Sequence, residues 1–122
     1  MDLEQELANH AELKQCLKEA LSRQNSLDAD AVSRDDRCQL GQWLHSHAKG
    51  AYGGLGILQT CISRHAMLHR EAGQIARLIN QRRFQDAARA LDDDALDVAI
   101  SAAASSIHLL RQAIGEDKPE SA

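Results

Sequence analysis

The sequence predicts an all-α fold, a four-helix bundle with an additional short helix, and two observations carry this prediction. Apolar residues recur in alternating steps of three and four along three long segments, which is typical of helices that pack along a narrow seam. The 122-residue chain has one proline and only one Trp, one Tyr and one Phe. Its core must therefore consist of Leu, Ile and Ala, which favours helices over a sheet.

The length predicts one domain over residues 1–122, with a polar tail that frays from about residue 115. The first seam contains Leu3, Leu7, His10, Lys14, Leu17 and Leu21. The second long seam contains Leu55, Leu58, Ile62, His65, His69, Ala72, Ala76 and Ile79. The last contains Leu96, Ile100, Ala103, Ile107, Leu110 and Ile114. Each seam predicts one long helix.

Two shorter helices complete the prediction. One begins near Asp35 or Asp36 and carries Trp43, and the other covers residues 84–91. The polar residues 25–33 and the glycine-rich residues 50–56 are predicted connections. The glycine-rich stretch is not a phosphate loop, because it lacks the Gly-Lys-Ser/Thr ending and no strand precedes it.

Charge and hydropathy exclude several classes of protein. The formal net charge is −4 and basic residues do not cluster, so we expect no nucleic-acid partner. No apolar run reaches the roughly 18 residues of a membrane span, and the N-terminus is acidic, so we expect a cytoplasmic protein with no membrane contact. The three cysteines, an odd number, argue against a disulfide framework.

Three of the six histidines occupy seam positions where the pattern calls for an apolar residue. These are His10, His65 and His69. Burying an unpaired imidazole costs about 1–3 kcal/mol, so three together need a shared purpose. His65 and His69 are four residues apart and leave the same helix face one turn apart. That spacing lets one helix donate two nitrogens to one metal ion.

Cys38 supplies the fourth candidate ligand. It is predicted in the first turn of its helix, behind the possible caps Ser33, Asp35 and Asp36. A helix N-terminus stabilises a thiolate, which is the form that binds zinc. With the three imidazoles it makes a closed tetrahedral His3Cys set for Zn²⁺. Four good ligands, and no carboxylate base at motif spacing, argue against an enzyme.

The remaining cysteines are predicted to be small core residues. Cys61 lies eight residues before His69, roughly 12 Å along a helix, and is too far away to share one zinc ion with it. Cys16 flanks the first seam and is also predicted to be a small core residue.

The other titratable residues near the motif receive weaker assignments. His45 and His47 are predicted to point to solvent, and His108 has no assigned role. Glu6 lies one turn before His10 and could orient its ring, although an exposed ion pair is the favoured interpretation.

Three motifs together resemble the chemoreceptor zinc-binding (CZB) domain family. Residues 38–43 (CQLGQW) are similar to its CxLGxW signature, residues 10–13 (HAEL) to its leading Hxx-aromatic-or-Leu element, and residues 65–69 (HAMLH) to its HxxxH. Residues 80–87 resemble the family's bend into a short helix. The resemblance covers about residues 7–114. Leu13 replaces the commoner Trp, which affects packing and leaves the ligand assignment intact.

The resemblance implies a bacterial, cytoplasmic regulatory domain that binds zinc. Members are commonly attached to chemoreceptors or diguanylate cyclases, and zinc itself or oxidation of the zinc-bound cysteine are proposed signals. The resemblance therefore predicts a sensor that acts through a protein partner in signal transduction, such as chemotaxis. The alternative is a zinc-stabilised structural or dimerisation domain with no sensing role. The chain is either a free-standing member, which Met1 and the acidic tail favour, or a fragment of a longer protein.

A homodimer is predicted from the family and from an apolar surplus around the last helix. The residues of this surplus are Leu96, Val98, Ala99, Ile100 and Ala102. Such a face exceeds what a monomeric bundle can bury and could pair with its symmetry mate.

Overall fold

The computed structural model describes residues 1–115, and all regular secondary structure in this range is helical. The α-helices are α1 (Leu3–Ala11), α2 (Leu13–Arg23), α3 (Ala29–Ser33), α4 (Gln39–Trp43), α5 (Lys49–Tyr52), α6 (Gly56–Asn80), α7 (Phe84–Asp92) and α8 (Asp94–Ile114). A π-helical segment, η1 (Leu44–Ala48), joins α4 to α5. The all-α prediction is confirmed for these residues. The fraying predicted for the tail falls on residues 116–122, outside the described part.

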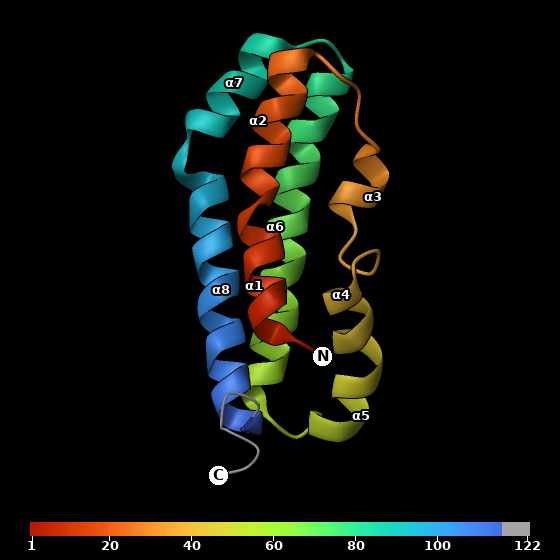
Figure 1. The fold of residues 1–122 in the computed structure, drawn as a ribbon, viewed down its shortest axis with the longest axis vertical. Coiled ribbons are helices and arrows are strands. Elements are labelled where there is room, and N and C mark those ends of the chain that lie inside the picture. Colours follow the sequence, from red (N-terminus) through yellow and green to blue (C-terminus); the bar gives the residue numbers. More distant parts are fainter. Residues whose placement is uncertain (116–122) are drawn as a thin grey trace.

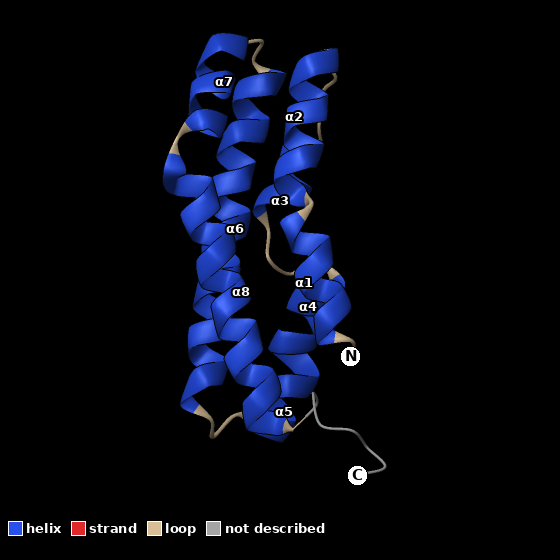
Figure 2. Ribbon diagram, turned by 60° about the vertical axis from the view of Figure 1, so that its left-hand side comes forward, coloured by secondary structure: helices blue, strands red, loops and turns tan. Residues whose placement is uncertain are grey.

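The helices run along one common axis (Figure 1). α1 and α2 follow each other in one column, α8 and α7 form another, and α3, α4 and α5 follow each other along a further side. α6 spans the length of the molecule and packs against α2, α3, α7 and α8. Figure 2 shows the same columns from a second direction. α6 is therefore the helix against which the others are positioned.

The first seam forms two helices where one was predicted. The side chain of Asp2 caps α1 by accepting a hydrogen bond from the Gln5 N–H at 3.0 Å. α1 ends at Ala11. The next residue, Glu12, has a ψ of −10° that departs from the helical value, and α2 begins directly after it. The interruption is one residue long, so both helices keep the same direction and the same seam.

Residues 25–56 depart furthest from the prediction. α3 occupies part of the expected connection because the Asp28 side chain accepts a hydrogen bond from the Ala31 N–H at 3.1 Å and starts a helix there. α4 begins at Gln39, later than predicted. α5 covers the start of the predicted glycine-rich linker and α6 its last residue, so the linker shrinks to residues 53–55.

The core is divided into two apolar clusters along α6. One lies between α2, α6, α7 and the first half of α8, and includes Leu17, Leu68 and Leu96. The other lies between α1, α4, η1 and the far ends of α6 and α8, and includes Leu3 and Leu44. Each cluster is apolar throughout, and the polar residues of α6 that are buried fall between them. In residues 1–115, no helix combines the length and hydropathy needed to cross a bilayer.

Candidate metal centre

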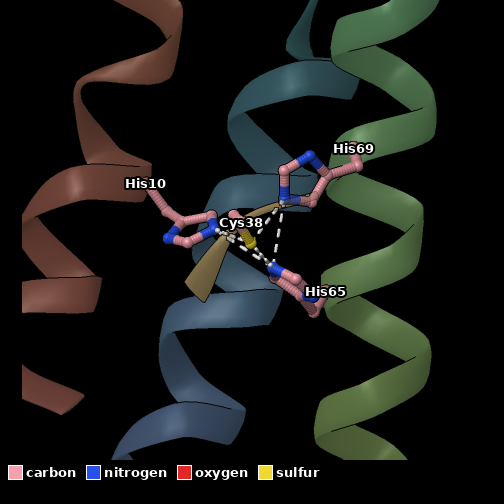
Figure 3. A group of neighbouring side chains, drawn as sticks. All are labelled: His10, Cys38, His65 and His69. Carbon is pink, nitrogen blue, oxygen red and sulfur yellow. Dashed lines mark hydrogen bonds between the residues drawn. The ribbon is translucent and has the colours of Figure 1, made fainter. Parts of the chain in front are cut away.

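The four side chains singled out by the sequence meet at one point between the two apolar clusters (Figure 3). His10 comes from α1, Cys38 from the residue before α4, and His65 and His69 from α6. One ligand atom from each lies within 4.8 Å of all the others. The three histidines are buried and Cys38 is half-buried. Residues far apart in the chain thus form a single group able to hold a metal ion.

Five of the six separations between the ligand atoms lie near the edges of a zinc tetrahedron, and the sixth, between His10 and His69, is within 4.8 Å. Nε2 of His65 lies 3.0 Å from Nε2 of His10 and 3.1 Å from Nε2 of His69. The Cys38 Sγ lies 3.3, 3.6 and 3.7 Å from Nε2 of His65, His69 and His10. Zinc bonds of about 2.0–2.1 Å to nitrogen and 2.3 Å to sulfur give tetrahedral edges of about 3.3–3.4 and 3.6 Å. An ion fits at the centre with little movement of the side chains.

Hydrogen bonds to two rings fix which nitrogen faces the centre. Nδ1 of His10 donates to the carbonyl oxygen of Glu6 at 2.8 Å, and Nδ1 of His69 donates to that of Val32 at 2.9 Å. The hydrogen is therefore on Nδ1, and each Nε2 directs a lone pair inward. Converging lone pairs repel one another unless a cation lies between them, so this donor arrangement suits a metal ion.

His65 is the most deeply placed member of the group. Burial, followed by the nearby His69 and His10, lowers its pKa to about 3, and burial also lowers the pKa of His69. These rings are neutral at physiological pH, as a metal ligand must be. Nδ1 of His65 is buried and has no hydrogen-bond partner within residues 1–115. Packing, rather than a hydrogen bond, therefore holds the outer side of this ring.

Cys38 caps α4 with its own sulfur. Its backbone is extended (φ −103°, ψ 161°), and its Sγ accepts a hydrogen bond from the Gly41 N–H at 3.4 Å. The predicted caps Ser33, Asp35 and Asp36 are wrong, since none of them caps this helix.

The helix N-terminus does not stabilise a thiolate by itself, contrary to the sequence-based expectation. Burial raises the pKa of Cys38 more than the N–H of Gly41 lowers it, and the charge of Glu6 raises it further. α4 has only five residues and offers a weak dipole. A bound cation is what would keep this sulfur deprotonated.

Gly41 allows the loop before α4 to lie close to the site. A Cβ at this position would overlap the backbone carbonyl oxygen of Asp35 and lie 3.2 Å from Cε1 of His65. The closest neighbour of Gly41 is therefore the Asp35 backbone, and a larger residue at this position would displace it.

Glu6 and Val32 contribute to the site in ways that the sequence did not reveal. Glu6 is only 5% exposed, so its interpretation as an exposed ion pair is wrong. It orients His10 through its backbone carbonyl, while its carboxylate oxygen lies 3.9 Å from Nδ1 of that ring. Val32 belongs to α3, a helix that was not predicted, and no pattern in the sequence marks its carbonyl as a partner of His69.

The other cysteines and histidines lie outside the group. Cys61 is fully buried in an apolar cluster, which confirms its assignment to the core. Cys16 is exposed, so its assignment to the core is wrong. His45, His47 and His108 are exposed, although His45 also contacts a carboxylate oxygen of Asp35 at 2.8 Å.

A profile of the family described as chemoreceptor zinc-binding domain matches residues 10–76, a stretch that starts at His10 and includes all four clustered side chains. The chain belongs to this CZB family. Zinc is therefore the cofactor of this CZB domain, and the family is regulatory rather than catalytic. Comparison with curated proteins and with solved structures gave no match.

Proposed function

We propose that this CZB domain holds one zinc ion through Nε2 of His10, His65 and His69 and Sγ of Cys38, and that it works as a regulatory sensor. The observation that carries the proposal is the convergence of these four atoms, with separations of 3.0–3.7 Å among the measured pairs. Four protein ligands close the tetrahedron and leave no open position for a substrate, so we propose no enzymatic activity.

The proposed signal is a change in zinc level, oxidation of Cys38, or both. The ion would tie α1 and the segment before α4 to α6, and His69 extends this connection to α3 through Val32. Oxidation would remove the only anionic ligand and leave three neutral imidazoles to hold a divalent ion. A cleft of about 260 Å³, lined by Cys38, His10 and His69, gives small solutes access to the sulfur.

We propose that the domain acts in the cytoplasm of a bacterium, as a homodimer and through a signalling partner such as a chemoreceptor or cyclase. We also propose that its columns of helices, α1 with α2, α3 with α4 and α5, α6, and α7 with α8, amount to a four-helix bundle. Val98 and Leu109 of α8 are 62% and 48% exposed and could contribute to such an interface. Leu96 and Ala99 are buried in the chain's own core. The apolar surface of α8 that is available to a second copy is therefore smaller than the sequence suggested.

Metal analysis of protein purified without added metal tests the ligand set. We expect one zinc per chain in the natural protein and in Cys16→Ser, whose exposed thiol is remote from the centre, and a large loss in Cys38→Ser. Treatment with a limiting two-electron oxidant, followed by a chromophoric chelator, tests the sensing role. Zinc release should persist in Cys16→Ser; release that requires Cys16 would contradict the proposal.

A purely structural zinc is the second candidate, since the site joins α1, α3 and α6. The two apolar clusters favour the sensor, because they hold most of the helices together without the ion. Removal of zinc with a chelator distinguishes the two roles. A sensor stays folded and rebinds zinc reversibly, whereas a structural site unfolds as a whole when the ion leaves.

A further inference from the structure

The carboxylate of Glu6 is buried beside the metal centre without a cationic partner. Its Oε2 accepts a hydrogen bond from the Asn9 side chain at 3.2 Å, and Oε1 lies 3.9 Å from Nδ1 of His10. The hydrogen of that Nδ1 is already directed at the Glu6 carbonyl. Within residues 1–115, no lysine or arginine forms an ion pair with Glu6. A carboxylate that is so little exposed to water gains from a positive charge nearby.

The metal centre supplies a charge of the required sign. Zn²⁺, one thiolate and three neutral imidazoles sum to +1, and the Glu6 carboxylate carries −1. Glu6 lines the same cleft as Cys38 and His69, so it lies beside the ligand set.

The other carboxylates near the centre already have partners. Asp35 contacts His45 at 2.8 Å and its side chain is 24% exposed. Asp36 accepts two hydrogen bonds from the Arg34 guanidinium, at 3.0 and 2.9 Å. Glu6 is therefore the carboxylate at this site whose charge remains to be balanced.

We infer that Glu6 is the counter-charge of the metal centre and makes the site prefer divalent over monovalent ions. This inference rests on the proposed four-ligand zinc site. Soft thiolate and imidazole donors also suit Cu⁺, so the ligands alone discriminate weakly. Cu⁺ with one thiolate gives a neutral centre and leaves Glu6 uncompensated, whereas Zn²⁺ balances it. The selectivity comes from a residue that does not ligate the ion.

Dissociation constants for Zn²⁺ and, under anaerobic conditions, Cu⁺ test this inference by competition with chromophoric chelators. In Glu6→Gln, which keeps the shape and loses the charge, zinc binding should weaken about 10–100-fold. Cu⁺ binding should change by less than about threefold, because a neutral centre gains nothing from a nearby charge.

Three further variants complete the experiment. Glu4→Gln removes the same charge from the same helix at a side chain that is 80% exposed, and should alter neither constant. Glu6→Asp retains the charge and should keep most of the preference for Zn²⁺. Glu6→Met removes the charge without needing a polar partner, and should reproduce the Gln result even if Glu6→Gln fails to fold.

Two results would overturn the inference. Equal weakening of Zn²⁺ and Cu⁺ binding would show that Glu6 acts only through packing, and unchanged zinc binding would show that its charge has no role. Failure of the underlying site is distinguishable, because the natural protein would then bind no zinc, or Cys38→Ser would bind it equally well.

Discussion

Nε2 of His65 lies 3.0 Å from Nε2 of His10, although 55 residues separate the two in the chain. Their rings are held in different ways. Nδ1 of His10 donates to a backbone carbonyl, whereas Nδ1 of His65 has no partner in the described part of the chain. The orientation of His65 depends on the atoms packed around it, and the backbone at Gly41 is one of these neighbours.

Gly41→Ala should therefore impair the metal site. The added methyl group would overlap the Asp35 carbonyl and press on the ring of His65. We expect zinc binding about 10–100-fold weaker and a free energy of unfolding lower by about 1–3 kcal/mol. Calorimetric titration and urea unfolding measure the two effects. Gly50→Ala is the matched control, because a Cβ there meets nothing within 4 Å; equal behaviour of the two variants would contradict the prediction.

Gly73→Ala should act on His69 through α3. A Cβ on residue 73 would overlap the Ser33 side chain and lie 2.8 Å from its Cα, so α3 would have to move away from α6. The Val32 carbonyl would then lose its hydrogen bond to His69, and zinc affinity should fall about tenfold or more. Gly56→Ala, on the same helix in open space, should bind zinc normally. An unaltered dissociation constant for Gly73→Ala would show that α3 does not position this ligand.

Removal of zinc should loosen one side of the molecule selectively. Hydrogen exchange should accelerate in α1 and in residues 25–43, while the halves of α6 and α8 that pack in the apolar clusters remain protected. Zinc at 1,000 times its dissociation constant should raise the free energy of unfolding by about 4 kcal/mol. Uniform exchange along the whole chain would contradict this localisation.

Acid should destabilise the metal-free protein. The pKa of His65 is about 3 when folded, against 6.5 for an ordinary histidine, so below pH 6.5 the unfolded chain binds more protons than the folded one. Stability should fall as the pH drops from 6.5 towards 3, by on the order of 2 kcal/mol at pH 5 from this residue. Urea unfolding at several pH values measures the slope. His65→Leu should flatten it, whereas substitution of the exposed His108 by Gln should not.

The metal-binding candidates could be predicted because they break a strong local pattern. His10, His65 and His69 stand where the seam otherwise carries apolar residues, and a spacing of four fixes two of them on one helix face. The long helix over residues 56–80 follows from the same periodicity, because it depends on local order in the sequence.

Other features depend on tertiary contacts that no local pattern encodes. Cys16 and Glu6 both flank the first seam, yet one is exposed and the other buried, because their exposure is decided by neighbouring elements. α3 was missed because Asp28 is equally suited to a turn and to a helix cap. The partner of His69 was missed together with that helix.

The position of the polar site between two apolar clusters has a consequence for helix alignment. Apolar seams tolerate sliding, because a shift of one turn, about 5.4 Å, exchanges one aliphatic contact for another. A one-turn shift of α1 would instead bring Leu7 or Lys14 level with His65, and only the observed position presents an imidazole. The buried histidines thus specify a single register between α1 and α6, and a bound ion would lock that register.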